Sequence, residues 1–388
     1  MNIVKCTNGH FFDSDKYDEC PYCAEKGEHV FEERRDMDDQ MTISGNAACD
    51  MLFENQLTER YLETKEKILE VIKATGFVPN NSARYLKRSE TNSIALLVKG
   101  ITNPFFTRMI QVIEEGVEER KYTTILRHVG PMEDEVLIAL SLVKERKLKG
   151  IVFLGGNFTH DSQLLQQLGV PFVFATIGED LEEESSRAQL INGKVGYANI
   201  AVDDVKASAD AVTYLIEQGH RRIGIIAEGL GIPSVGQLRL RGYRKALEEH
   251  KIPFDSDHLA VVSGGIDPYS MPNGYRAAKE LLEKDPELTA IFCISDVIAI
   301  GACRAILDSG RRIPEDVSVI GFDGIETGDY CNPRLTTMQQ PFTEISQAAI
   351  SVLFGMIEKK KKPQDRIMEA ELVVRESTGK APEARAEA

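Results

Sequence analysis

Residues 94–98, Ile-Ala-Leu-Leu-Val, form an unbroken apolar run, and a stretch with helical spacing of apolar residues, 106–121, follows it. The same alternation continues along the chain, with further predicted strands at 122–126, 150–154 and 171–175. Short apolar runs that alternate with amphipathic stretches are typical of parallel strands covered by helices on both faces. The sequence therefore predicts an α/β fold.

A polar stretch at 179–196 interrupts this pattern, which then resumes. A second series of predicted strands follows at 222–227, 259–263, 290–295 and 317–323. Two series of similar size predict two doubly wound parallel-sheet lobes. Ligands bind at the carboxyl ends of strands in such sheets, so we expect the site in a cleft between the lobes.

The charge of the chain limits how it can contact nucleic acid. The 388 residues carry a formal net charge of −15. Binding to DNA relies on Lys and Arg that neutralise phosphates, so it requires a local basic element here. Residues 1–60 hold 14 Asp and Glu against 6 Lys and Arg, whereas residues 61–92 hold 4 against 6. The second segment is the only mildly basic one.

The sequence shows no membrane or export signal. No apolar run reaches the length of a membrane-spanning helix, and the N-terminus lacks the apolar core of a secretory signal. We therefore expect a cytoplasmic protein without membrane contact.

Two pairs of metal-ligating residues lie near the N-terminus, Cys6 with His10 and Cys20 with Cys23. Four such ligands in two close pairs suit a tetrahedral Zn²⁺. A segment of about 30 residues cannot bury a sufficient core alone, so the metal would supply its folding energy. The segment resembles small bacterial zinc ribbons, and four protein ligands predict a structural site. Its many acidic residues favour contact with protein over contact with phosphate.

Enzyme signatures are missing from the sequence. It contains no Gly-x-x-x-x-Gly-Lys-Ser/Thr loop, no Gly-x-Ser-x-Gly elbow and no His-Glu-x-x-His motif. Gly229-Leu230-Gly231 follows a predicted strand, but Ser234 stands where a dinucleotide fingerprint has its third glycine. We expect that the chain is not an enzyme.

Six short motifs occur in order along the two predicted lobes. They are Asn103-Pro104-Phe105-Phe106, Gly219-His220-Arg221-Arg222-Ile223, Arg239-x-x-Gly242-Tyr243, Ser295-Asp296-x-x-Ala299-x-Gly301, Ile313-Pro314-Glu315-Asp316-Val317 with its continuation to Asp323, and Pro333-Arg334-Leu335-Thr336-Thr337. Together they resemble the effector-binding body of the lactose-repressor (LacI/GalR) family of bacterial transcription regulators. The resemblance extends from about Lys65 to Gly379, and the ordered set is far more specific than any one motif.

The resemblance implies two periplasmic-binding-protein-like lobes joined by three crossovers, near 198–199, 337–338 and 362–366. The expected parts are a zinc ribbon (1–30), a charged linker with a degenerate helix-turn-helix region (31–60), a third helix and hinge helix (61–92), an N-terminal lobe (93–199 and 338–363), a C-terminal lobe (200–337 and 364–379) and a disordered tail (380–388). The resemblance also implies a homodimer and a small-molecule effector, expected to be a sugar. Effector binding would change the affinity for operator DNA.

The resemblance assigns six residues to the effector site: Asp323, Arg239, Asp296, Phe105, Phe106 and Asn103. Carboxylates at strand ends suit sugar hydroxyls, and a guanidinium group can bind a ligand carboxylate through two hydrogen bonds. The two phenylalanines would offer an aromatic face to the effector. The alternative is that one phenylalanine belongs to the core and the other to the dimer interface.

The basic segment resembles the hinge helix of the family, in which a leucine enters the minor groove of the operator. The matching leucine is Leu86, and Arg84, Lys87 and Arg88 lie beside it and can reach phosphates. Short hinge helices of this kind are not stable alone in water. We therefore expect this segment to become ordered when it binds DNA in the manner of the family. The alternative is that residues 80–90 only link an inactive N-terminus to the sensor body.

The segment upstream of the hinge departs from the family. Residues 42–56 lack the family's helix-turn-helix pattern, and no Arg or Lys occurs between Met37 and Glu59. A recognition helix needs donors for phosphates and base edges. The first two helices are thus eroded, or the zinc ribbon replaces them. One hypothesis is a ligand-responsive, DNA-binding transcription regulator; the alternative is an effector sensor that has lost autonomous DNA binding and signals to a protein partner through its zinc ribbon.

Overall fold

The computed structural model describes residues 3–5, 11–13, 92–157, 160, 162–177, 190–191, 195–229, 234–262, 267–359 and 361–382. The chain divides into two units, residues 1–87 and 88–388. In the first unit, strand β1 (Ile3–Lys5) pairs with β2 (Phe11–Asp13) in an antiparallel hairpin. The proposed zinc ligands and hinge residues lie outside the described residues.

The first lobe of the second unit is built on a parallel sheet with the strand order β14-β8-β6-β5-β3-β4. Its strands are β3 (Ser93–Lys99), β4 (Thr123–Val129), β5 (Leu148–Leu154), β6 (Phe172–Ala175), β8 (Val195–Val202) and β14 (Arg366–Met368). The short β7 (Leu190–Ile191) pairs antiparallel with β8. The predicted βα alternation is therefore confirmed in this lobe.

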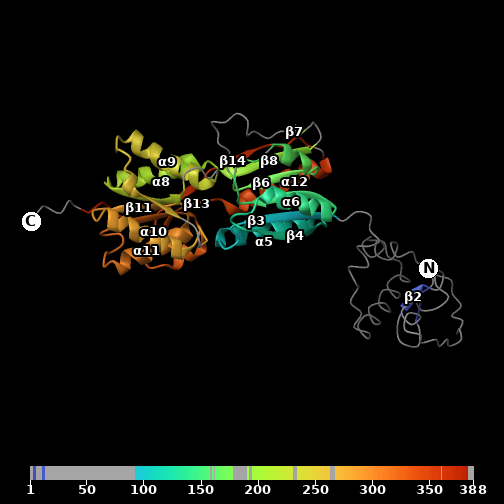
Figure 1. The fold of residues 1–388 in the computed structure, drawn as a ribbon, viewed down its shortest axis with the longest axis horizontal. Helices are drawn as coiled ribbons and strands as arrows, with labels where there is room; N and C mark the ends of the chain where they lie inside the picture. Colours follow the sequence, from blue (N-terminus) through green and yellow to red (C-terminus); the bar gives the residue numbers. More distant parts are fainter. Residues whose placement is uncertain are drawn as a thin grey trace, which may run out of the picture. The chain divides into compact units, whose positions relative to one another are not determined.

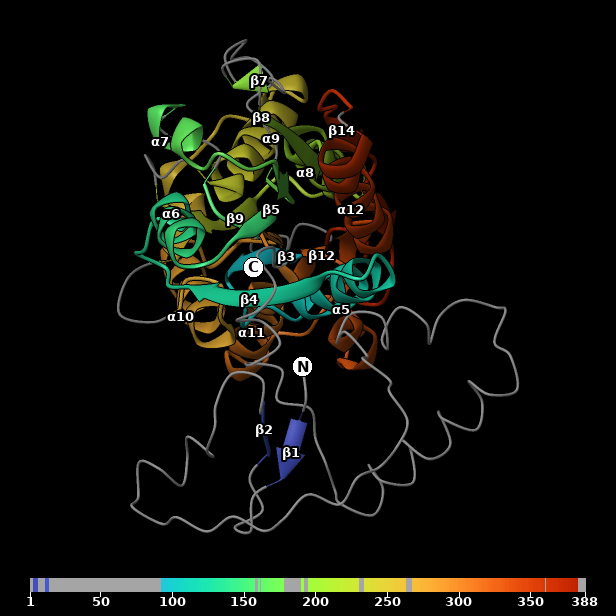
Figure 2. The same ribbon diagram turned by 90° about the vertical axis from the view of Figure 1, so that its right-hand side faces the viewer.

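Helices cover both faces of this sheet. They are α5 (Pro104–Glu119), α6 (Glu135–Glu145), α7 (Ser162–Gln167) and α12 (Phe342–Lys359). Along β3, Ile94, Leu96 and Val98 join one buried cluster, while Ala95 and Leu97 join the other. In Figure 2, α6 and α12 lie on opposite sides of β3 and β5. Because both faces are covered, every residue from Ile94 to Val98 is apolar, which explains the unbroken run in the sequence.

The second lobe has a sheet with the strand order β10-β9-β11-β12-β13-β15. Its strands are β9 (Ile223–Glu228), β10 (Leu259–Val262), β11 (Ala290–Cys293), β12 (Ser318–Asp323), β13 (Thr336–Gln339) and β15 (Glu371–Val373). Only β15 is antiparallel to its neighbour. The main helices are α8 (Asp204–Glu217), α9 (Val235–Glu249), α10 (Met271–Lys284) and α11 (Asp296–Asp308), with short 3-10 turns η2 (Ser256–His258) and η3 (Glu326–Tyr330). Figure 1 shows this lobe beside the first, joined by the crossing segments.

The chain crosses between the lobes three times, as expected, but each crossing comes later than predicted. Strand β8 continues to Val202, β13 continues to Gln339, and β14 still pairs with β8 of the first lobe. Residues 366–368 therefore belong to the first lobe, which corrects the predicted boundary at 363–364. This pairing could not be predicted from the sequence, because β14 is a mostly exposed edge strand without an apolar run.

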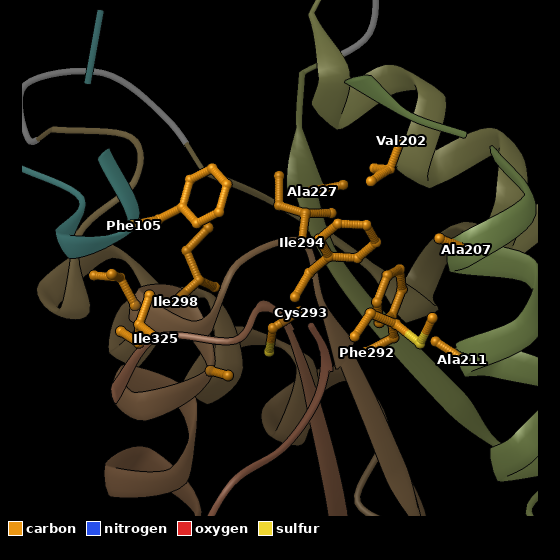
Figure 3. Packing of buried hydrophobic residues seen from close by; sticks show 14 of the residues in the cluster. Phe105, Val202, Ala207, Ala211, Ala227, Phe292, Cys293, Ile294, Ile298 and Ile325 are labelled. Carbon is orange, nitrogen blue, oxygen red and sulfur yellow. The ribbon is translucent and has the colours of Figure 1, made fainter. Parts of the chain in front are cut away.

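The buried apolar side chains of the two lobes are continuous. One cluster contains core residues of the first lobe, such as Ile94 and Val98, together with core residues of the second, such as Phe292 and Ile320. Figure 3 shows Phe105, from the start of α5, with Ile298 of the second lobe in this cluster. The apolar side chains at this contact therefore pack against side chains of both lobes.

Candidate effector-binding site

Asp323 is the last residue of β12 and lies where the two lobes meet. Its side chain is buried, and its backbone has a φ of 117°, which non-glycine residues rarely adopt. Its Oδ2 accepts a hydrogen bond of 2.9 Å from Asn103, and its Oδ1 accepts one of 2.9 Å from Gln340. Burial raises the pKa of Asp323, while Arg239 and the two amide donors act in the opposite direction. Strained backbone of this kind is concentrated at functional sites.

Asn103 supplies the contact from the first lobe. It caps the N-terminus of α5, where its Oδ1 accepts the backbone N–H of Phe105 at 3.1 Å. Its Nδ2 donates to Asp323 of the second lobe. The predicted pair Asn103 and Asp323 is thus brought together by two segments that are 220 residues apart.

Arg239 of α9 is almost fully buried beside Asp323. Its Nε donates to Oδ1 of Asp204 at 2.8 Å, and one terminal nitrogen lies 3.5 Å from Oδ1 of Asp323. The guanidinium carbon stands 3.7 Å from the centre of the Phe322 ring. Burial raises the pKa of Asp204 to about 6, against the effect of Arg239. Opposite charges and an aromatic face therefore fix the guanidinium in one orientation.

Gly242 lets Arg239 occupy this position. A Cβ atom on Gly242 would stand only 2.3 Å from the carbonyl oxygen of Val205 on α8. The helices α8 and α9 therefore approach each other more closely at this point than any side chain allows. The spacing Arg239-x-x-Gly242 in the sequence reflects this contact.

Asp296, the first residue of α11, is fully buried and already bonded within the chain. Its Oδ2 accepts the backbone N–H groups of Gly324 and Ile325, each at 2.8 Å. Its Oδ1 accepts the hydroxyl of Thr337 at 2.6 Å. Asp296 thus holds the loop that follows Asp323, and this contact gives it a structural role beside the predicted effector role.

The two phenylalanines have different surroundings. Phe105 is buried in the apolar cluster, whereas Phe106 is only partly buried against it, and their rings meet edge to face at 5.5 Å. Phe106 also lies over Gly155, where an added Cβ would stand 2.9 Å from its Cζ. The placement of Phe105 agrees with the alternative of a core residue, and Phe106 is the better placed of the two for a ligand.

Sequence reasoning missed a set of polar residues in the first lobe. Lys99, at the end of β3, places its Nζ 3.0 Å from Oε2 of Glu135, the first residue of α6. The Oε1 of Glu135 accepts the backbone N–H of Asn157 at 2.8 Å and lies 3.6 Å from Nε2 of His160. One signal was available, because Lys99 directly follows the predicted strand 94–98 and parallel strands direct their carboxyl ends toward the site.

The second lobe contains a corresponding set of polar residues that the sequence analysis did not identify. Glu228, the last residue of β9, is buried and accepts a hydrogen bond from the Ser234 hydroxyl. Ser234 in turn forms an isolated β-bridge with Asn157 of the first lobe. Burial raises the pKa of Glu228, with Ser234, Tyr269 and the two cations Arg239 and Lys99 acting against it. Charged residues of both lobes, Lys99 from the first and Glu228 and Arg239 from the second, therefore interact electrostatically with one another.

Comparisons with known proteins agree with this architecture. Residues 212–378 match the family model of a periplasmic binding protein-like domain. The chain is 36% identical over 321 residues to the transcriptional regulator MalR of Clostridium butyricum, covering 81% of this chain and 90% of the relative. It is 30% identical to the transcriptional repressor CytR of Escherichia coli, covering 82% and 89%.

Solved structures give the same result. A complex of the transcriptional regulator CelR with cellobiose shares 26% identity and a TM-score of 0.63, with 86% of this chain and 94% of that chain covered. A LacI family regulator from Enterococcus faecium with bound ribose shares 27% identity and a TM-score of 0.61, with 74% and 99% covered. Within the described residues, no helix combines the length and apolar character needed to cross a membrane. The chain belongs to the lactose-repressor (LacI) family of transcription regulators, and it is not an enzyme.

Proposed function

We propose that this ligand-responsive, DNA-binding regulator binds a sugar where its two lobes meet, and that the sugar sets its affinity for operator DNA. The observation that carries the proposal is the position of Asp323, whose carboxylate contacts Asn103 of one lobe and Arg239 and Gln340 of the other. A ligand hydroxyl bound to Asp323 would alter contacts in both lobes at once. Such differential contact is what couples a ligand to a conformational equilibrium.

The sugar assignment is supported by the comparisons and by the chemistry of the site. Similar regulators were solved with cellobiose and with ribose. The described residues at the contact between the lobes supply carboxylates, an amide and a guanidinium group, which are the polar groups that hydrogen-bond to sugar hydroxyls. Asp323, Arg239, Asn103, Asp296 and Phe106 are the proposed contacts.

In this proposal the chain forms a homodimer, and the basic segments (residues 61–92) of its two subunits contact the operator. Leu86 would enter the minor groove, and Arg84, Lys87 and Arg88 would contact phosphates. The protein would act in the cytoplasm. The test is selection of DNA from a random pool by the full chain at low and moderate salt. Enrichment of a palindrome that a sugar releases supports the proposal, and binding without sequence preference contradicts it.

A second function is supported by the acidic N-terminus. Residues 1–60 carry a strong excess of acidic side chains, and no basic residue occurs from 38 to 58. This composition opposes phosphate contact and favours a protein partner. The alternative is therefore an effector sensor that acts on a partner protein through its zinc ribbon. The same DNA selection separates the two functions.

We also propose that Cys6, His10, Cys20 and Cys23 hold one structural Zn²⁺. The hairpin supports this ligand set, because Lys5 pairs with Phe11 and the five residues that connect the strands begin with Cys6 and end with His10. The described residues contain no cluster of three or more metal-ligating side chains, and the four proposed ligands lie outside them. A bound zinc would supply folding energy to a segment of about 30 residues, a length too short to bury a sufficient core alone.

A further inference from the structure

One end of the first lobe faces away from the second lobe. Asn103 and Asn157 follow β3 and β5, and both contact the second lobe, so the carboxyl ends of these strands face that lobe. The strands run parallel, and their amino ends therefore lie at the opposite end. Helices α5 and α6 end shortly before β4 and β5 begin, and Leu353, late in α12, packs against Gly150 of β5. We call this end the distal end, formed by residues 118–122, 144–149, 358–359 and 361–362.

Cations are concentrated at the distal end of an otherwise acidic chain. The whole chain has 46 Lys and Arg against 61 Asp and Glu, whereas these segments hold nine Lys and Arg against four Glu. Four of the cations, called the distal cations below, are exposed: Lys144, Arg146, Lys361 and Lys362. The distal end is thus a basic surface, which the net charge of the chain does not reveal.

The cations that follow α6 and α12 lie at one common end. Tyr122 directly precedes β4 and is partly buried. Burial and Glu358 raise the pKa of Tyr122, while Lys149 acts in the opposite direction. Residues from the end of α12 and the start of β5 therefore both lie near the Tyr122 hydroxyl. The backbone N–H of Lys361 donates to the carbonyl of Gly355 at 3.0 Å, which keeps this lysine beside the last turns of α12.

The distal cations differ from the surface cations of the second lobe. Lys279, Lys284 and Arg304 each form an ion pair with a carboxylate four residues away on the same helix. Among the described residues, the distal cations form no ion pair. The negative end of a helix dipole accounts for Lys144, in the last turn of α6, but Arg146 lies beyond that helix. The distal cations are therefore available to an anionic partner.

The segment with the proposed DNA contacts joins the first lobe at the distal end. The carbonyl of Asn92, the residue before β3, accepts the backbone N–H of Thr123 at 2.8 Å, so the chain enters the lobe beside the amino end of β4. Arg88, a proposed phosphate contact, precedes Asn92 by only four residues. Four residues span at most about 14 Å. Phosphates next to those that Arg88 contacts would therefore come within reach of the distal end.

We propose that the distal end is a second DNA-contacting surface, on which the distal cations bind phosphates that flank the operator. The inference rests on the proposed function, since it concerns the same complex with DNA. Lys and Arg bind phosphates of any sequence and release counterions, so this surface adds affinity and no sequence preference. The entry of the proposed DNA-binding segment at this end favours DNA over an acidic protein as the partner.

The test measures binding of the full chain to two duplexes by fluorescence anisotropy at several salt concentrations. Both duplexes carry the palindrome obtained by the DNA selection. One ends with the palindrome, and the other continues for about ten base pairs, one helical turn, on each side. The distal variant is Lys144→Gln/Arg146→Gln/Lys361→Gln/Lys362→Gln. The control variant removes the same charge from exposed lysines of the second lobe, as Lys245→Gln/Lys251→Gln/Lys279→Gln/Lys284→Gln.

We expect the wild type to bind the long duplex at least about tenfold more tightly than the short one at low salt, and the distal variant to bind the two equally. On the long duplex, the slope of log affinity against log salt should be shallower by at least about 2 in the distal variant, since each lost phosphate contact removes about 0.9. The control variant should behave like the wild type, and both variants should keep the wild-type melting temperature.

An unchanged flank effect and salt slope in the distal variant overturns the inference. If Leu86→Ala still loses operator binding in that case, the proposed function stands. An equal loss in the control variant also overturns the inference, because it shows a general effect of charge. Tighter DNA binding by the distal variant does so too, since it shows that an acidic protein segment occupies the distal cations. If the wild type enriches no DNA, the proposed function fails and this inference fails with it.

Discussion

The carboxylate of Asp323 accepts a hydrogen bond of 2.9 Å from the side-chain amide of Asn103, which belongs to the other lobe. The amide also caps α5, so one side chain connects the start of a helix in the first lobe to the end of a strand in the second. A ligand that takes the place of this amide changes the contact between the lobes. If a ligand replaces the hydrogen bond between Asn103 and Asp323 with one of its own, the position of one lobe relative to the other can change.

Asp323→Ala should weaken sugar binding about ten- to a hundredfold, because hydrogen bonds to a charged group contribute about 1.5–3 kcal/mol. Calorimetric titration measures the change, and circular dichroism verifies that the variant is folded. Asp308→Ala is the control, since this carboxylate contacts Arg304 on the surface of α11. Equal affinities in the wild type and Asp323→Ala would remove Asp323 from the site.

Asp296→Asn should change how stability depends on pH. Burial, reinforced by Asp323, raises the pKa of Asp296 to about 8 from an ordinary value of 3.8. The folded chain then holds this proton where the unfolded chain has released it, so the contribution of Asp296 is complete below pH 4 and is lost as the pH rises to 8. Asparagine carries no such proton, so the free energy of unfolding should fall less steeply with pH in the variant.

Urea unfolding at pH 5, 6.5 and 8 measures this difference. Asp296→Ala serves as the comparison, because it leaves the N–H groups of Gly324 and Ile325 and the hydroxyl of Thr337 without their acceptor. This variant should lose about 1–3 kcal/mol for each group left unsatisfied. Parallel pH profiles for the wild type and Asp296→Asn would show that Asp296 is ionised in the folded chain.

Gly242→Ala should destabilise the second lobe by about 1–3 kcal/mol, because the new methyl group collides with the Val205 carbonyl and forces α8 and α9 apart. Gly355→Ala on α12 is the matched control, since its Cβ would meet only Lys361 at 3.6 Å. This substitution should stabilise the chain by a few tenths of a kcal/mol to about 1 kcal/mol. Urea denaturation gives both values, and a neutral Gly242→Ala would contradict the tight helix contact.

Leu86→Ala should abolish specific operator binding and leave sugar affinity unchanged. The apolar side chain suits the gap between unstacked bases, and alanine is too short to fill it. Electrophoretic mobility shifts with the selected palindrome measure the loss. Leu137→Ala, at a half-exposed position on α6, should bind the operator like the wild type. Undiminished operator affinity in Leu86→Ala would show that the hinge is not used in this way.

Purified protein should contain one zinc ion per chain, and the double variant Cys20→Ser/Cys23→Ser should contain none. Elemental analysis by mass spectrometry measures both. The thiolates supply two of four ligands, so their loss leaves a pair that cannot complete a tetrahedral site. Wild-type zinc content in the double variant would refute the ligand set.

The strands and the two lobes could be predicted from the sequence because strands buried on both faces leave an unbroken apolar run, as β3 and β9 do. Asp323 and Arg239 could be proposed from ordered motifs. His160 and Glu135 could not, because each is a single polar residue whose partners come from distant segments. Strand β14 was assigned to the wrong lobe for a related reason, since its place depends on pairing with β8 and not on its own residues.

The pairing of β14 with β8, and of β15 with β13, has a mechanical consequence. Strands β14 and β15 belong to different lobes, yet only Glu369 and Ala370 separate the end of one from the start of the other. A connection this short spans roughly 10 Å when fully extended, so the lobes cannot slide far past each other. Their remaining freedom is rotation about the line of the three crossing segments. A sugar that binds between the lobes would therefore act on the angle between them.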